Sequence, residues 1–206
     1  MLRAVIVIDY QNIHLTARGK FTAPGTPTHE SLVHPLRFAE QLLIARANAK
    51  GADAPAVKVA KVHTFRGLPS NRHDPTSYRR SQAQQAEWTR DPRVEVTYRP
   101  LRYQEINGVL TPQEKGVDVL VALKFTELVA AAQYDVAILA AHDTDLEPAL
   151  EVALRSDAAR SRKVTVETAG WYQCKRIAPR NGDRKPWHTF LAVNHFTNAR
   201  DLKDYT

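Results

Sequence analysis

Short apolar runs alternate along the chain with longer segments whose apolar residues recur at helical spacing. The runs are residues 3–9, 57–65, 93–98, 135–141 and 163–168. Runs of this length that are rich in Val and Ile are typical of strands buried on both faces, and such strands occur in parallel sheets. The pattern therefore predicts a central, mostly parallel sheet of about five strands.

Helices are predicted between these runs. They cover residues 35–50, about 77–88, 111–131 and 144–155. Pro35 suits the first turn of its helix, and Gly51 suits its end. Residues 111–114, with the sequence Thr-Pro-Gln-Glu, have the spacing of a capping box and predict a helix start. Residues 10–31, which are rich in Thr, Pro, Gly and His, are expected to form a loop.

Strands and helices that alternate in this way predict an α/β fold of the doubly wound type, a three-layer α/β/α sandwich. The length of 206 residues fits one such domain. We expect the domain to span residues 1–168, with residues 169–206 as an irregular, basic C-terminal extension packed on it. Within the extension, residues 189–193 either add a last strand or pack beneath the domain.

Composition and charge narrow the class of partner. The net charge of +7 and the pI near 9.6 favour a polyanion, nucleic acid first of all. Cys174 is the single cysteine, which excludes a disulfide within the chain and favours a reducing compartment. The N-terminal apolar run is too short for a signal peptide, and no stretch approaches the length of a membrane span. We therefore expect a cytoplasmic protein without a membrane partner.

Four aspartates are the main candidates for chemistry: Asp9, Asp118, Asp143 and Asp145. Asp9 ends the first predicted strand, and Asp143 and Asp145 follow the fourth. In an open parallel sheet the ligand crevice lies beyond the carboxyl ends of the strands. Asp118 shares a helix face with apolar residues, where an unpaired carboxylate is costly. Carboxylates gathered at one edge repel one another unless a cation holds them, so a divalent metal site is predicted.

Simpler interpretations exist for each of these residues. Asp9 can cap the next turn, and Asp143 or Thr144 can cap the following helix. Asp118 can be stabilised by the dipole at the start of its helix. Capping does not explain why several aspartates should converge on one edge of a sheet, so the metal site is preferred. His142 is interpreted as a turn or packed residue rather than as a ligand or base.

Three segments of the chain occur in a characteristic order. They are residues 7–12 (Val-Ile-Asp-Tyr-Gln-Asn), residues 115–119 (Lys-Gly-Val-Asp-Val) and residues 134–139 (Tyr-Asp-Val-Ala-Ile-Leu), which lead into residues 143–146 (Asp-Thr-Asp-Leu). In order and spacing they resemble the NYN-domain family, a branch of the PIN-like nuclease superfamily. The resemblance covers roughly residues 3–168 and implies a PIN-like α/β/α sandwich with a central parallel sheet.

The resemblance also implies metal-dependent hydrolysis of RNA. The family's acidic cluster corresponds here to Asp9, Asp118, Asp143 and Asp145, as catalytic residues and as ligands of Mg²⁺ or Mn²⁺. A metal-bound water would attack the phosphodiester in line and leave 5′-phosphate and 3′-hydroxyl ends. The chain departs from the family at Ala141-His142, where relatives often carry Ser-Gly, and at Lys124, where relatives can carry an acidic residue.

Substrate contacts are predicted around this cluster and in two basic regions. The predicted substrate-binding residues are Asn12, Lys115, Arg79, Arg80 and Thr144. The first basic region holds Arg66, Arg72, Arg79, Arg80, Arg90, Arg93, Arg99 and Arg102. The second holds Arg160, Arg162, Lys163, Lys175, Arg176, Arg180, Arg184 and Lys185. The candidate platforms for stacked bases are Tyr78, Trp88, Trp171, Tyr172 and Trp187. A solvated surface for the arginines and a packed position for the tryptophans are the simpler interpretations.

These observations predict a divalent-metal-dependent endoribonuclease whose partner is single-stranded or structured RNA. One alternative is an RNA- or nucleotide-binding module of the same fold that is catalytically weak or inactive. Another is a phosphatase-like enzyme with Asp143 as its nucleophile. A homodimer and an inhibitor protein are further partner hypotheses, for which the sequence shows no interface.

Overall fold

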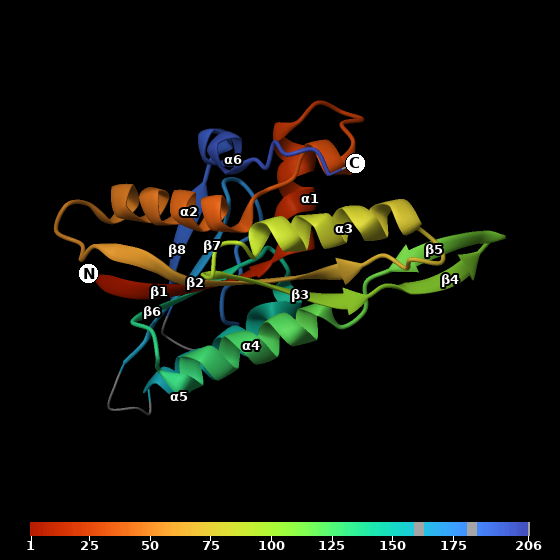
Figure 1. Ribbon diagram of the computed structural model, residues 1–206. Helices are drawn as coiled ribbons and strands as arrows, with labels where there is room; N and C mark the ends of the chain where they lie inside the picture. The colour runs from red at the N-terminus through yellow and green to blue at the C-terminus, as the bar shows by residue number, and fades with distance from the viewer. Residues whose placement is uncertain (159–162, 181–184, 206) are drawn as a thin grey trace.

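The computed structural model describes residues 1–158, 163–180 and 185–205. One central sheet is built from parallel strands in the order β3-β2-β1-β6-β7-β8. These strands are β1 (Leu2–Asp9), β2 (Val57–Leu68), β3 (Val94–Pro100), β6 (Val136–Ala140), β7 (Thr165–Trp171) and β8 (Trp187–Leu191). Helices cover both faces of the sheet (Figure 1), so the protein is the three-layer α/β/α sandwich that the sequence predicts.

The helices divide unequally between the two faces. One face carries α1 (Tyr10–Phe21), α2 (Pro35–Lys50), α3 (Pro75–Trp88) and α6 (Val193–Ala199). The other carries α4 (Val117–Ala131) and α5 (Glu147–Ala158). Two short 3-10 helices, η1 (Thr28–Glu30) and η2 (Thr144–Leu146), precede α2 and α5. No helix within the described ranges is long and apolar enough to cross a membrane.

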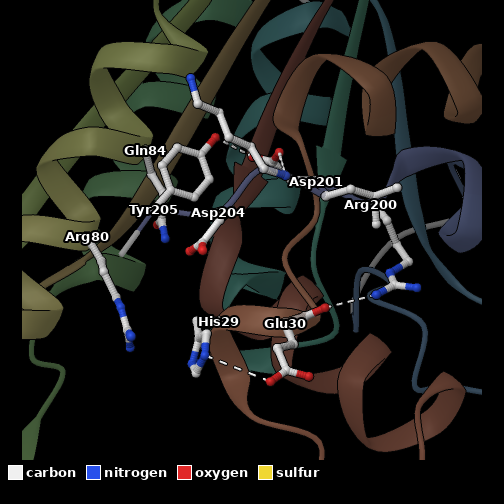
Figure 2. Close-up of a pocket in the computed structure, with 10 residues that line it drawn as sticks. His29, Glu30, Arg80, Gln84, Arg200, Asp201, Asp204 and Tyr205 are labelled. Carbon is white, nitrogen blue, oxygen red and sulfur yellow. Dashed lines mark hydrogen bonds and ion pairs between the residues drawn. The ribbon is translucent and has the colours of Figure 1, made fainter.

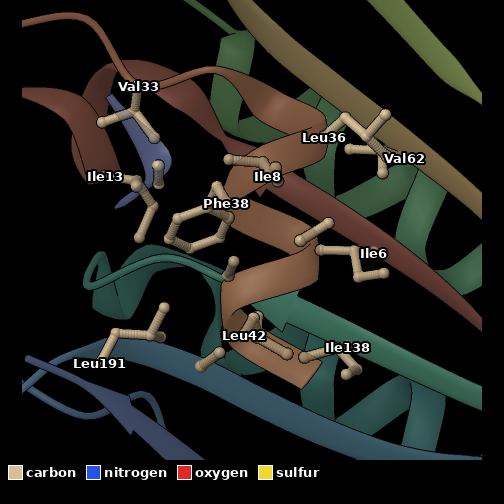
Figure 3. Close-up of a cluster of buried hydrophobic side chains, with 14 of the residues drawn as sticks. Ile6, Ile8, Ile13, Val33, Leu36, Phe38, Leu42, Val62, Ile138 and Leu191 are labelled. Carbon is tan, nitrogen blue, oxygen red and sulfur yellow. The ribbon is translucent and has the colours of Figure 1, made fainter. Parts of the chain in front are cut away.

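Strand β1 lies at the centre of the core and contributes to both of its layers. Ile6 and Ile8 belong to the same buried cluster as the side chains of α2 (Figure 3). Val5 and Val7 belong to the cluster on the opposite face, which includes α4 and α5. Because both faces are covered, β1 is an unbroken apolar run instead of an alternating one. The central strands are therefore visible in the sequence without any knowledge of the fold.

The loop expected over residues 10–31 is wrong, because α1 begins directly after β1. The Asp9 carboxylate caps α1 by accepting a hydrogen bond from the backbone N–H of Asn12 at 3.2 Å. The buried residues of α1 are Tyr10, Ile13, His14 and Ala17. Their spacing is that of one helix face. Because Tyr and His have polar atoms, this buried face is not recognisable in the sequence as an apolar pattern.

The predicted helix start at residues 111–114 is also wrong. Residues 102–113 form an antiparallel hairpin of β4 (Arg102–Ile106) and β5 (Val109–Gln113), which projects beyond the central sheet (Figure 1). Its turn is Asn107-Gly108, and both residues have positive φ, at 52° and 76°. That geometry is typical of a two-residue hairpin turn with an Asn-Gly sequence, a signal that the capping-box spacing concealed. Helix α4 begins only at Val117.

The C-terminal region adds to the central sheet. β7 continues to Trp171, and β8 (Trp187–Leu191) pairs with it in parallel as the sixth strand. Of the two alternatives for residues 189–193, the structure therefore shows the strand. α6 then packs against α2.

Candidate active site

The sheet changes its direction of growth at β1. β2 and β3 lie on one side of β1, and β6, β7 and β8 lie on the other. The carboxyl ends of β1 and β6 lie together, since Ile8 is paired with Ala140. Ligands of doubly wound sheets bind at such a point, beyond the carboxyl ends of the two strands. Asp9 directly follows Ile8, and Asp143 lies three residues beyond Ala140, so both reach this edge, as the sequence predicts.

Asp9 is the most perturbed acid at this edge. Its side chain is only 6% exposed, and burial raises the pKa of its carboxyl to about 7. The hydrogen bond from Asn12 opposes this rise in pKa, whereas the carboxylates of Glu114, Asp143 and Asp118 add to it. The three carboxylates of Glu114, Asp143 and Asp118 are therefore close enough to Asp9 to disfavour its ionised form.

Glu114 is the member of this group that sequence analysis missed. One oxygen of its half-buried carboxylate accepts a hydrogen bond from the backbone N–H of Gly67, at the end of β2. Burial raises the pKa of Glu114, and Asp118 adds to the rise. A methyl group at Gly67 would lie 2.3 Å from Leu101 and 2.8 Å from the Glu114 carboxylate, so this approach needs glycine. The signal in the sequence is the position of Glu114 directly before the Lys-Gly-Val-Asp segment, but the spacing of residues 111–114 also fits a capping box.

Asn12 joins the two halves of the site. Its side-chain oxygen accepts a hydrogen bond from the backbone N–H of His142 at 2.6 Å, while its own backbone N–H binds Asp9. The first turn of α1 is thereby tied to the turn that follows β6. A direct contact between Asn12 and substrate stays a prediction.

His142 is a packed residue, and that interpretation is confirmed. Its Nε2 accepts a hydrogen bond from the backbone N–H of Trp171 at 3.1 Å, so its Nδ1 carries the proton and donates to the carbonyl of Lys175 at 2.8 Å. Burial lowers the pKa of His142, which keeps the ring neutral. A methyl group at Gly170 would lie 2.4 Å from the ring, so a glycine is required beside it. His142 thus holds the turn that carries Asp143.

The turn after β6 separates its two aspartates. Asp143 is half-buried and caps η2 by accepting the backbone N–H of Asp145 at 3.0 Å. Asp145 is exposed and lines a different surface pocket beside Arg180. Thr144 accepts a hydrogen bond from the ammonium group of Lys175 at 3.2 Å. The structure therefore groups Asp143 with Asp9 and places Asp145 at the margin of the site.

The acidic residues have the type of ligand atom that a divalent ion needs, but their side chains are not close enough together to bind one. Their donors are all carboxylate oxygens, the type that Mg²⁺ and Mn²⁺ prefer. Burial raises the pKa of Asp9 most, and the neighbouring carboxylates add to the rise; a bound cation would offset both effects. As placed, however, no three Asp, Glu, His or Cys side chains of the described residues could hold one ion together. The carboxylates would have to approach one another more closely to do so.

Two of the expected stacking platforms are part of the core instead. Trp88 and Trp171 are fully buried, so the prediction that they stack on bases is wrong. The Trp88 indole donates to Asp201 at 2.6 Å, and the Trp171 indole donates to the carbonyl of Ile13 at 2.8 Å. The exposed aromatic residues among the five are Tyr172 and Trp187.

The two basic regions are only partly available to a ligand. Arg93 pairs with Asp91 at 2.8 Å and Arg180 with Glu147 at 2.7 Å. Arg79 and Lys115 are exposed, whereas Arg80 is half-buried. The predicted contacts Arg160, Arg162 and Arg184 lie outside the described residues.

Comparisons with known proteins identify no family for the chain. No protein-family model and no curated protein matches the chain. A crystal structure of a protein of unknown function from Vibrio parahaemolyticus is similar, with a TM-score of 0.49 and 18% sequence identity over 85% of each chain.

Proposed function

We propose that the protein is a divalent-metal-dependent endoribonuclease that acts at the carboxyl edge of β1 and β6. The observation that carries this proposal is the grouping of Glu114, Asp118 and Asp143 around Asp9, a buried carboxyl whose pKa is raised to about 7. Strong perturbation of buried acids at a sheet crevice is typical of functional sites. Three of these acids are those that carry the NYN resemblance, which supplies RNA as the substrate.

Each acid has a separate part in this proposal. Asp9 and Asp143 would be the primary metal ligands, and Asp118 and Glu114 would complete the acidic set or orient water. A bound Mg²⁺ or Mn²⁺ would activate water and neutralise charge on the scissile phosphate. Asp145, which is exposed and lies beside Arg180 at the margin of the site, would not be a primary metal ligand. In-line attack by water would leave a 5′-phosphate and a 3′-hydroxyl.

The test is cleavage of end-labelled single-stranded RNA with Mn²⁺, Mg²⁺ or EDTA. We expect metal-dependent cleavage that falls by at least about a hundredfold in Asp9→Asn and Asp143→Asn, because each loses a primary ligand. Asp53→Asn is the matched control, since Asp53 is exposed in the loop before β2, at the opposite edge of the sheet. Cleavage that survives both site substitutions would overturn the proposal.

A second candidate function rests on the metal geometry. Because no three of the described acids form a ready ligand set, the alternative is an RNA- or nucleotide-binding module of the same fold that does not cleave. Salt-dependent RNA binding without cleavage under any of the metal conditions would support this alternative.

A further inference from the structure

A second feature lies beside the acidic site, between the α1–η1 segment and α3. It is a cavity of about 340 Å³, within the range of roughly 300–1,000 Å³ that is typical of ligand sites. The described residues that line it include Arg66, Arg80, His29, Ser77 and Ser81, and none of them is Asp or Glu. A cavity with two guanidinium groups, hydroxyls and no carboxylate favours an anion.

Arg80 is the residue in this cavity with unused hydrogen-bonding capacity. Its Nε is buried and has no hydrogen-bond partner among the described residues. Buried donors in native proteins nearly always have a partner, so an acceptor from a ligand would complete this group. Figure 2 shows Arg80 of α3 and His29 of η1 as separate side chains of the adjoining pocket, with no interaction drawn between them.

The cavity continues in two directions. It shares His29, Arg80 and Gln84 with a pocket of about 350 Å³ whose other wall includes residues 200–205. On its other side lies Arg66, whose guanidinium is 4.8 Å from the centre of the Tyr10 ring and donates to Gln84 at 2.6 Å. The adjoining pocket also holds the carboxylates of Glu30, Asp201 and Asp204, so the part that suits an anion is the cavity lined by Arg66 and Arg80.

Two residues at or near the cavity, Tyr10 and Arg66, are adjacent in sequence to residues of the acidic site. Tyr10 directly follows Asp9, and Gly67, which binds Glu114, directly follows Arg66. A polyanion that occupies the acidic edge therefore has a neutralising cavity next to it along the ends of β1 and β2. Such a cavity suits a phosphate adjacent to the one that reacts.

We propose that this cavity binds a phosphate group of an RNA strand held at the acidic edge, with Arg80 as the main phosphate ligand. The identity of the strand rests on the proposed function, whereas the affinity for phosphate does not. Arg66, which lies against Tyr10, adds positive charge to the cavity, and Ser77 and Ser81 contribute to its lining. Arg79, the neighbour of Arg80 in α3, is exposed and does not line the cavity.

The first experiment measures binding of inorganic phosphate in EDTA by calorimetry. We expect Arg80→Ala to weaken binding by about tenfold or more, because a charge-assisted hydrogen-bonding group is lost. Arg155→Ala removes the same charge from an exposed position in α5, on the other face of the sheet, and should change the affinity by less than about twofold. Arg80→Gln keeps most of the side-chain volume and replaces Arg80→Ala if that variant does not fold. Absence of saturable binding to the wild type, or equal losses in the two alanine variants, would overturn the proposal.

The second experiment distinguishes a terminal from an internal phosphate. It compares a 5′-phosphorylated tetraribonucleotide with its 5′-hydroxyl form, again in EDTA. Preference for the phosphorylated form that depends on Arg80 supports a terminal phosphate, and equal binding that Arg80→Ala weakens for both supports an internal one. Unchanged binding of both oligonucleotides to Arg80→Ala contradicts the cavity as an RNA site.

The two proposals fail in different ways. Asp9→Asn should keep phosphate binding that depends on Arg80, because the acids do not take part in it. Such binding by a protein that cleaves no RNA would leave the cavity proposal standing and contradict the nuclease. Metal-dependent cleavage together with phosphate binding that does not depend on Arg80 would support the nuclease and contradict the cavity proposal.

Discussion

At the residue scale, Asp9 has two roles that conflict in the absence of a cation. It caps α1, which stabilises the helix, but it does so as a buried carboxyl surrounded by Glu114, Asp118 and Asp143. Its pKa of about 7, against 3.8 for an ordinary aspartate, means that ionisation of Asp9 is unfavourable in the folded protein. The folded state therefore binds more protons here than the unfolded state does between these two pH values, and stability falls as the pH rises through them.

Asp9→Asn is expected to stabilise the metal-free protein at about pH 8. Asparagine caps helices as well as aspartate does, and it carries no charge to bury. Since one pKa unit corresponds to about 1.4 kcal/mol, the gain in the free energy of unfolding should be on the order of 4 kcal/mol. The gain should fall below about 1 kcal/mol at about pH 4, because Asp9 is protonated in the folded state and the unfolded state is then close to its own pKa of 3.8. Urea unfolding in EDTA at the two pH values measures it.

The control for this experiment is Asp53→Asn, which should leave stability nearly unchanged at both pH values because Asp53 is exposed. A loss of stability in Asp9→Asn at high pH would show that the carboxylate is favourable where it lies. Added Mn²⁺ should stabilise the wild type more than Asp9→Asn, since only the wild type keeps this carboxylate.

At the scale of elements, the turn between β6 and η2 depends on its contacts with β7 and α1. Asn12 of α1 and Trp171 of β7 both bind His142, which immediately precedes Asp143. His142, which stands where the NYN proteins that the sequence resembles often carry glycine, therefore has a packing role here. The larger His side chain is accommodated because Gly170 of β7 leaves room for it.

Gly170→Ala is expected to displace the His142 ring and destabilise the protein by about 1–3 kcal/mol, the usual cost of overpacking. Because the same turn carries Asp143, cleavage should fall as well if the proposed site is correct. Gly19→Ala is the matched control: Gly19 lies within α1 with nothing within 4 Å of an added methyl group. It should stabilise the protein by about 0.5–1 kcal/mol, as alanine does in helices. Thermal unfolding of both variants measures these changes, and equal effects of the two substitutions would contradict the contact with His142.

At the scale of the whole molecule, buried histidines and Asp9 act in opposite directions on the pH dependence of stability. Burial lowers the pKa of both His14 and His188 to about 4. Below the ordinary histidine pKa of about 6.5 the unfolded chain takes up protons that the folded protein does not, so acidification destabilises the fold. Protonation of Asp9 over the same range favours the folded state.

We therefore expect the wild type to lose stability between about pH 6.5 and pH 4.5, and Asp9→Asn to lose more over that interval. The reason is that the substitution removes the group that opposes the two histidines. Urea unfolding in EDTA at several pH values tests this expectation. A shallower pH dependence in Asp9→Asn than in the wild type would contradict it.

The architecture and part of the site could be predicted because both depend on local pattern. Apolar runs such as residues 3–9 mark strands that are covered on both faces, and the topology of such strands brings Asp9 and Asp143 to one edge. Helix α1 and the hairpin could not be recognised in the same way. Their buried or turn residues, such as His14 and Asn107, have more than one common structural role, and their surroundings decide which applies.

By itself, the sequence determined the layers of the fold, the parallel central strands and an acidic edge beyond β1 and β6. Only the tertiary structure decided that Glu114 joins this edge through Gly67, that Asp145 lies apart, and that Trp88 and Trp171 belong to the core. It alone placed Arg80 in a cavity next to the acids. The physical reason is that the burial of a strand can be inferred from residues adjacent in sequence. Which residues contact a given side chain depends instead on the packing of segments that are far apart in the chain.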